Sequence, residues 1–213
     1  MMTIFTYPLA QVLLKNKTDF TDIRSFNLYK KNEIYQLRNK HLSQILNKEI
    51  LNEDFSVTEW GKPYLTHDEE LAFNHTHSQN NYALAISQSY ADIGIDVEDL
   101  TRQVRYEALA KHAFHPNELY VWQLSDYSKE YWFKVWTTKE AVLKASGLGI
   151  RISLNELDTQ VSLEQNMGQC HHAAIGTLQY QNFLFNNMML TVAWVKCESE
   201  SEKKWPNIEI VSH

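Results

Sequence analysis

Two acidic residues in the segment 93–98, with sequence IGIDVE, offer the clearest opportunity for chemistry. Side chains two positions apart on a strand lie on the same side, so Asp96 and Glu98 are predicted to be neighbours while Val97 faces the other way. Two adjacent carboxylates repel each other unless a cation lies between them, and carboxylate oxygens suit Mg²⁺ or Mn²⁺. The alternative is that both carboxylates are solvated at a strand end, which is the usual position of acidic residues.

The segment 133–150, with sequence FKVWTTKEAVLKASGLGI, is predicted to be a largely apolar interior helix. Its periodicity places Phe133, Thr137, Glu140 and Lys144 in one narrow sector. A Glu four residues before a Lys is the favourable orientation for a helical salt bridge. Glu140 is therefore either the partner of Lys144 or a third carboxylate for a metal, with Lys144 beside the metal-bound anion.

Histidines and cysteines provide weaker signals. His75 and His77 would project together on a strand, but a zinc site would need a third ligand at recognisable spacing. His77, which stands beside Ser78, fits a hydrogen-bond donor to phosphate better than a zinc ligand. A histidine in a surface loop is an equal alternative. The run 170–172, Cys-His-His, is predicted to be a solvent loop, and the tryptophans at positions 60, 122, 132, 136 and 194 are predicted to be core aromatics.

Composition limits the functional class. The chain has 213 residues, 44% hydrophobic and 22% charged, which is typical of a globular protein. A net charge of −6 provides no basic field for nucleic acid. Two cysteines cannot form a disulfide framework and are expected to be reduced, and no stretch is long and apolar enough to span a bilayer. These properties predict a cytoplasmic protein without nucleic-acid or membrane partners.

The order of elements predicts an α+β fold of two similar halves, 1–100 and 101–213, that form a pseudo-dimer. Each half is predicted to be a small antiparallel sheet packed with helices. The first half is expected to hold a strand at 3–9, a helix at 30–51 and a hairpin of strands 82–87 and 91–97. The second is expected to hold helices at 102–113, 116–124 and 128–146, then a sheet of strands 173–180, 190–195 and 208–211, with 198–204 as a solvated turn.

Four motifs occur in order between Trp60 and Leu154: GKPYL, FNHTHS, IGIDVE and WTTKEAVLK followed by Gly-Leu-Gly. Together they resemble the 4′-phosphopantetheinyl transferase superfamily, in particular its larger, monomeric, Sfp-like type found with peptide and polyketide synthetases. Outside that span the resemblance is only general.

The resemblance implies transfer of the phosphopantetheine arm of coenzyme A to a serine of an apo acyl or peptidyl carrier protein, with release of adenosine 3′,5′-bisphosphate. It further implies that Mg²⁺, or Mn²⁺, binds to Asp96, Glu98 and Glu140. Lys144 would contact phosphate, and Glu140 and Lys144 would be catalytic. The implied contacts to coenzyme A comprise Lys62 and Pro63 on the adenine side, Thr76, His77 and Lys144.

This chain differs from the family pattern at two places. Thr76 stands where the family has Ser, a change that keeps the hydroxyl. The family's arginines near the 3′-phosphate have no clear counterpart: Gln44 falls near one expected position, and the available basic residues are Arg24, Lys30, Lys31, Arg38 and Lys40.

The carrier-docking surface is predicted to include Arg102, Arg105 and Lys111, with Phe114 and Trp122 beyond them, or else these basic residues form a solvated helix face. Two alternative functions remain: a catalytically silent module that binds the carrier or coenzyme A, and a metal-dependent phosphohydrolase that uses the same carboxylates.

Overall fold

The computed structural model describes residues 1–149, 151–185, 187–196 and 205–213. Its helices are α1 (Leu9–Val12), α2 (Ile23–Leu46), α3 (Tyr106–Ala113), α4 (Pro116–Leu124) and α5 (Lys129–Ser146). Its strands are β1 (Met2–Pro8), β2 (Phe55–Val57), β3 (Pro63–Leu65), β4 (Ala72–His77), β5 (Asn81–Ser87), β6 (Ile93–Asp99), β7 (Met167–His172), β8 (Gly176–Phe185), β9 (Met188–Val195) and β10 (Ile208–Ser212). Short 3₁₀ helices occur at Lys17–Asp19, Asn52–Asp54 and Leu154–Glu156.

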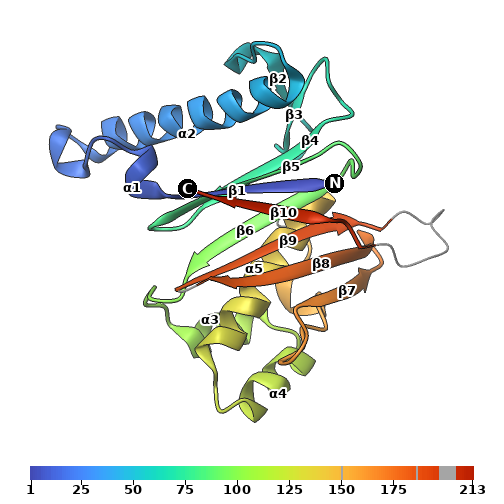
Figure 1. Cartoon of the computed structure of the whole chain (residues 1–213). Coiled ribbons are helices and arrows are strands. Elements are labelled where there is room, and N and C mark those ends of the chain that lie inside the picture. The colour runs from blue at the N-terminus through green and yellow to red at the C-terminus, as the bar shows by residue number, and fades with distance from the viewer. Residues whose placement is uncertain (150, 186, 197–204) are drawn as a thin grey trace.

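In the part of the chain that the structure describes, the β structure consists of two four-stranded sheets and a small β2–β3 pair. The first sheet has the order β10-β1-β5-β4, and the second has the order β6-β9-β8-β7. Among the described residues, every strand pairing is antiparallel except that of β1 with β10. The chain is therefore an α+β protein with small sheets packed against helices, as predicted (Figure 1).

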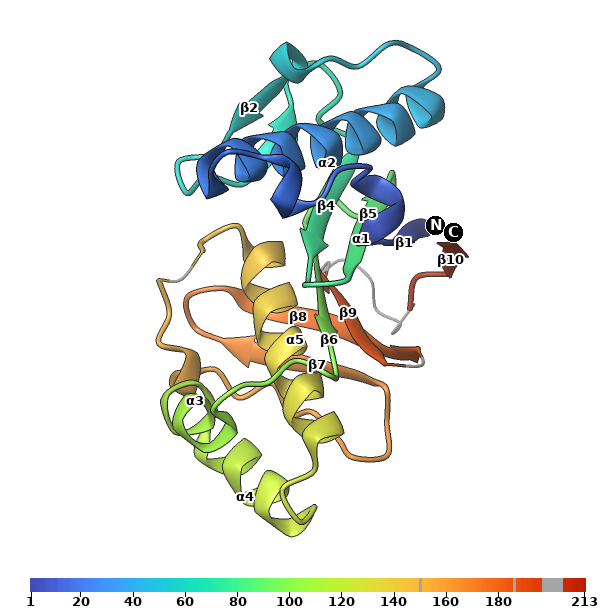
Figure 2. The same ribbon diagram turned by 90° about the vertical axis from the view of Figure 1, so that its left-hand side faces the viewer.

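The four layers lie in the order α2, first sheet, second sheet, α5. Alternation along the strands produces this arrangement, because successive side chains face opposite sides. Apolar residues of α2 pack on one face of the first sheet, its other face packs on the second sheet, and α5 covers the far side. Figure 2 shows α2 at one end of the molecule and α3 and α4 at the other.

The strands at 82–87 and 91–97 are present, but the predicted hairpin between them is wrong. β5 pairs with β1 and β4, whereas β6 pairs with β9 in the second sheet. The C-terminal strand was also predicted in the wrong sheet, since β10 pairs with β1. Strand periodicity gives the buried face of a strand but does not give its partner. A division of the chain near residue 100 stays a prediction, and the segment 198–204 lies outside the described residues.

Helix ends follow their capping residues. α2 begins at Ile23, earlier than predicted, because the side chain of Asp22 accepts a hydrogen bond from the Ser25 amide. It ends where Asn47 adopts the left-handed conformation. The Ser128 side chain caps α5 by accepting a hydrogen bond from the Tyr131 amide, and Gly147 ends that helix in the left-handed conformation with a φ of 71°. Among the described residues, no helix combines the length and apolar composition that a membrane span requires.

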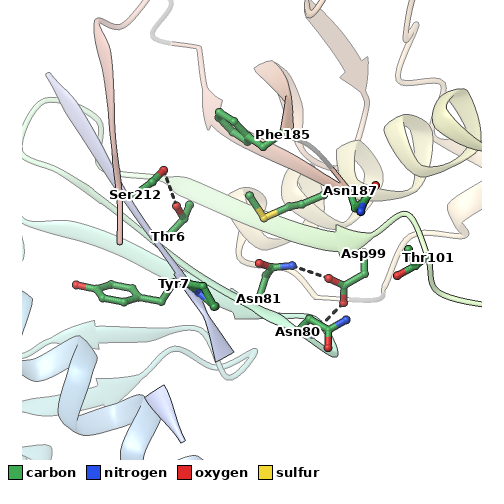
Figure 3. A pocket seen from close by; sticks show the side chains of 11 residues that line it. Thr6, Tyr7, Asn80, Asn81, Asp99, Thr101, Phe185, Asn187 and Ser212 are labelled. Carbon is green, nitrogen blue, oxygen red and sulfur yellow. Dashed lines mark hydrogen bonds between the residues drawn. The ribbon is translucent and has the colours of Figure 1, made fainter. Parts of the chain in front are cut away.

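One hollow lies where the two sheets meet, at the ends of β1, β6 and β10 (Figure 3). The buried carboxylate of Asp99 accepts hydrogen bonds there from the Asn80 amide at 3.0 Å and from Asn81 Nδ2 at 2.5 Å. These bonds join the end of β6 to the turn that follows β4, which are the two strands that carry the predicted site residues.

Candidate functional site

Asp96 lies on the face of β6 that is turned toward α5 and is 6% exposed. Its Oδ1 accepts hydrogen bonds from Lys144 Nζ at 2.6 Å and from Thr76 Oγ1 at 3.1 Å. Its Oδ2 is buried and has no hydrogen-bond partner within the described ranges. Burial raises the pKa of Asp96, and the Lys144 charge offsets part of that rise. The carboxylate is therefore costly to ionise and has a free acceptor oxygen.

The ammonium of Lys144 crosses from α5 to β6. Besides Asp96, it donates to the Ile95 carbonyl oxygen at 3.1 Å and to Thr76 Oγ1 at 3.2 Å. The ion pair of Lys144 is thus formed with Asp96, so the predicted Glu140–Lys144 salt bridge is wrong. Gly94 explains the difference: a Cβ there would lie 2.1 Å from the Ala141 carbonyl oxygen, so only glycine lets α5 pack this closely on β6.

Glu140 and Glu98 complete the acidic group. Burial raises the pKa of Glu140, and the charge of Asp96 raises it further. Burial also raises the pKa of Glu98, whose Oε1 forms an ion pair with Arg102 Nη1. All three predicted metal ligands thus have carboxyl groups whose charge is disfavoured in the folded chain.

In the part of the chain that the structure describes, no three His, Cys, Asp or Glu side chains are grouped so that they could hold a metal ion. The carboxylate of Glu98 is instead engaged in the ion pair with Arg102. The donor chemistry nevertheless fits a hard cation, because Asp96 Oδ2 is an uncompensated buried acceptor and burial disfavours all three charges.

A cavity of about 240 Å³ lies beside these residues, between the turn before β3, strand β4 and the C-terminal end of α5. Lys62 in its wall donates to the Ala145 carbonyl oxygen at 2.9 Å and pairs with Asp92 at 3.3 Å. Burial lowers the pKa of Lys62. The residues that line the cavity are Trp60, Gly61, Lys62, Pro63, Asn74, His75, Glu140, Leu143, Lys144, Gly147 and Gly149.

Thr76 and His77 have different surroundings. The Thr76 hydroxyl bridges Asp96 and Lys144, so it belongs to the acidic group. The ring of His77 lies 3.3 Å from the Ser78 carbonyl oxygen through Nδ1, and desolvation followed by the charge of Lys30 lowers its pKa. Within the described residues, His77 forms no hydrogen bond or ion pair with Asp96 or Lys144, and the charge of Lys30 on α2 lowers its pKa more than the charge of Lys144 does.

A basic hollow that the motifs did not reveal lies beside Lys30. Lys15, Lys17 and Lys30 line it together with Gln79 and Asn80, which follow His77 closely in the chain. Lys15 and Lys17 belong to the polar run before α2, and their charge is the signal that could have identified them. No carboxylate is among the residues that line this hollow.

Arg38 is not available for a phosphate. It is 3% exposed, its guanidinium carbon lies 3.7 Å from the centre of the Phe55 ring, and burial lowers its pKa to about 10. The sequence offered Arg38 as an available basic residue, but the Phe55 ring of β2 covers its guanidinium. Arg24 and Lys40 are exposed on the same helix.

Part of the predicted docking surface is wrong, because Phe114 and Trp122 are buried in the core beneath α3 and α4. Arg105 and Lys111 are exposed on α3 or just before it. The pairing of Arg102 with Glu98 ties the third basic residue to the acidic group.

The remaining motifs are structural. Cys170 is buried on β7 with a pKa raised by burial to about 12, so the predicted solvent loop is wrong. Trp122, Trp132 and Trp194 are core residues as predicted, and Trp136 stacks on Trp132. Trp60 instead lines the cavity, where the Arg151 guanidinium lies 3.5 Å from its ring centre.

Divalent cations should change the pH dependence of stability. The ordinary pKa values are 3.8 for Asp96 and 4.5 for the glutamates, and all three are raised on folding. The folded chain then binds these protons more tightly than the unfolded chain, so the contribution of these three carboxyl groups to stability should fall as the pH rises from about 4 to 7. Mg²⁺ at 100 times its dissociation constant should restore about 2.7 kcal/mol at pH 7.

Thermal unfolding with and without Mg²⁺ measures this effect. Relative to the native chain, the triple variant Asp96→Asn, Glu98→Gln, Glu140→Gln should gain stability as the pH rises from about 4 to 7, and it should show no Mg²⁺ response. An equal Mg²⁺ shift in the native chain and the triple variant would contradict binding at these carboxylates.

The family model and the relatives that match this chain all carry the same description. Residues 92–186 match the family model of the 4′-phosphopantetheinyl transferase superfamily. The chain is 35% identical over 119 residues to a 4′-phosphopantetheinyl transferase, gsp, of Aneurinibacillus migulanus, covering 54% of this chain and 47% of that protein. It is 41% identical over 101 residues to the 4′-phosphopantetheinyl transferase HetI of a Nostoc species, covering 45% of this chain and 42% of that protein.

A longer match is found with a Synechocystis protein assigned as a 4′-phosphopantetheinyl transferase, at 31% identity over 170 residues. That match covers 73% of this chain and 68% of the Synechocystis protein. For the Aneurinibacillus and Nostoc relatives, the matched part of this chain spans less than half of their length. The segment 92–186 that matches the family model contains β6 and α5, which carry Asp96 and Lys144. The chain therefore belongs to the 4′-phosphopantetheinyl transferase superfamily.

Proposed function

We propose that this protein transfers the 4′-phosphopantetheine arm of coenzyme A to a serine of an apo acyl or peptidyl carrier protein and releases adenosine 3′,5′-bisphosphate. The observation that carries the proposal is the Asp96–Lys144 pair beside the cavity: a buried carboxylate with a free oxygen and an ammonium held by three acceptors. Such a site matches a substrate that has anionic oxygens and can bring a cation.

Asp96, Glu98 and Glu140 are the residues that would hold Mg²⁺, or Mn²⁺, which supplies positive charge to the pyrophosphate of coenzyme A. Their raised pKa values support this assignment, because a bound cation would relieve the cost of ionising them. Arg102 would have to release Glu98 for that carboxylate to take part.

In the proposed reaction, the serine oxygen forms a bond to the β-phosphorus while the bond from that phosphorus to the bridging oxygen breaks. The bridging oxygen leaves with the electron pair as part of adenosine 3′,5′-bisphosphate. Lys144 stabilises the charge that develops on the leaving phosphate, and Thr76 holds the ammonium in place. Glu140, whose pKa is raised by burial, takes the serine proton.

The nucleotide would bind between the cavity and the basic hollow. Lys62 and Pro63 line the cavity on the side assigned to adenine. His77 and Lys30 lie at the other end, where the hollow lined by Lys15 and Lys17 suits the anionic 3′-phosphate.

The site takes residues from both halves of one chain, since Thr76 and Lys62 precede residue 100 and Lys144 follows it. This supports a monomeric enzyme, which we place in the cytoplasm with its coenzyme A. The net charge of −6 provides no overall attraction for an acidic carrier. Arg105 and Lys111 are the exposed basic residues proposed for docking.

A catalytically silent module that binds coenzyme A or the carrier is the second candidate. The Glu98–Arg102 pair favours it, because that pair withdraws one of the three carboxylates. The proposal of an active transferase rests on the retained Asp96, Glu140 and Lys144.

One assay tests the proposal. The protein is incubated with coenzyme A, Mg²⁺ and an apo carrier protein, and the carrier is weighed by mass spectrometry. Addition of phosphopantetheine to the carrier serine is expected. Binding of coenzyme A without transfer to several carriers would favour the silent module, and phosphate release without a carrier would favour a phosphohydrolase.

A further inference from the structure

The imidazole of His75 lies in the wall of the cavity that also contains Glu140 and Lys144. Its Nδ1 is buried and has no hydrogen-bond partner among the residues that the structure describes. A buried polar atom without a partner is costly, and the rest of the ring is partly exposed in the cavity wall, where a ligand can contact it.

The ring is held firmly by aromatic neighbours. The Tyr35 ring meets it edge to face at 6.0 Å between centres, and the Tyr82 ring lies 5.9 Å away. Because these contacts fix the imidazole before any ligand arrives, a hydrogen bond to it would cost little conformational entropy.

His75 is uncharged at neutral pH. Burial, followed by the charges of Arg38, His77 and Lys144, lowers its pKa to about 3. A neutral imidazole has one N–H donor and one acceptor nitrogen, so it suits an uncharged polar group better than a phosphate. Lys144 already supplies the positive charge on this side of the cavity.

The other walls suit a flat ring. Trp60, Pro63 and Leu143 provide apolar surface, and the ammonium of Lys62 is directed to the Ala145 carbonyl oxygen and Asp92. A planar heteroaromatic group with polar atoms on its edge matches apolar faces combined with one neutral hydrogen-bonding ring.

We infer that His75 is a specificity-determining residue that hydrogen-bonds the edge of the purine base of coenzyme A. This inference rests on the proposed function for the identity of the ligand. The purine edge offers ring-nitrogen acceptors and an exocyclic amino donor, so either neutral tautomer of His75 finds a partner.

The variant His75→Phe keeps a planar ring and removes both nitrogens. The dissociation constant of adenosine 3′,5′-bisphosphate, measured by calorimetry, should rise roughly 5- to 50-fold. The KM for coenzyme A should rise in parallel while kcat stays within about two-fold, because the bond is made equally before and during the reaction. His75→Gln, which keeps a donor and an acceptor near the Nε2 position, should recover part of the binding.

Tyr82→Phe is the matched control. Tyr82 is fully buried, its hydroxyl also lacks a partner in the described chain, and its ring touches His75, but it does not line the cavity. Its removal should leave nucleotide binding unchanged. Equal weakening in both variants would show that packing, and not recognition, explains the effect.

Base analogues provide a second readout. The native protein should bind adenosine 3′,5′-bisphosphate more tightly than inosine 3′,5′-bisphosphate, and His75→Phe should reduce that preference. Unchanged binding and unchanged preference in His75→Phe would overturn the inference. Failure of the proposed function gives a different result: the native protein would bind the bisphosphate but transfer nothing to any carrier. A native protein that does not bind the bisphosphate would overturn both the proposed function and the role of His75.

Discussion

Replacing Asp96 with asparagine is expected to reduce the rate of transfer to a carrier protein by about 10²- to 10³-fold. The substitution removes the charge that orients Lys144 and the free oxygen assigned to the cation, while it keeps the size of the side chain. Turnover at saturating coenzyme A and Mg²⁺ measures the effect. Near-normal turnover would show that Asp96 is not part of the reaction site.

The same variant is expected to lose little or no stability at neutral pH. The pKa of Asp96 is raised in the folded chain, so its ionised form opposes folding as the pH rises above 3.8, its ordinary value. Asparagine removes that cost, and Lys144 keeps its bonds to the Ile95 carbonyl oxygen and Thr76. Loss of activity without loss of stability is typical of residues selected for function.

Asp99→Asn is the matched control for Asp96→Asn. Asp99 is on the same strand and is also buried, but its carboxylate bonds Asn80 and Asn81 on the side away from α5 (Figure 3). Its substitution should lower the free energy of unfolding by about 1–3 kcal/mol and leave most of the turnover. The two variants thus separate a chemical role from a structural one.

Replacing Gly94 with alanine is expected to have the largest effect on the fold. The added Cβ would lie 2.1 Å from the Ala141 carbonyl oxygen and 2.3 Å from the Ala145 nitrogen, which are backbone atoms of α5. Because neither can rotate away, the helix must move from β6, at a cost of about 3 kcal/mol or more. Lys144 would then lose its reach to Asp96, so transfer should fall with stability.

Gly176→Ala serves as the control for Gly94→Ala. Gly176 has a φ of 71° and open space around its Cβ position, far from the site in the turn between β7 and β8. Its substitution should cost about 1–2 kcal/mol through backbone strain alone and should not change turnover in the folded fraction. Urea unfolding and single-turnover assays measure both quantities. Equal losses of turnover in the two variants would contradict a positioning role for Gly94.

The sequence by itself determined the chemical groups and the elements that carry them. Asp96 on a strand and Glu140 with Lys144 on an interior helix follow from side-chain periodicity, which is a local property. Local start and stop signals located α4, with Pro116 at its first position, and the end of α5 at Gly147. The family resemblance is confirmed by the Synechocystis relative together with the family model that matches residues 92–186.

Only the tertiary structure decided how these groups pair. Lys144 bonds Asp96 and not Glu140, because Gly94 allows α5 to approach β6 more closely than helix periodicity can indicate. Arg38 and Phe114 looked accessible in the sequence but are covered by elements distant in the chain. The sequence did not predict the partners of β6 and β10 for the same reason. These strands pair with strands more than 80 residues away in the chain, and no local pattern specifies such contacts.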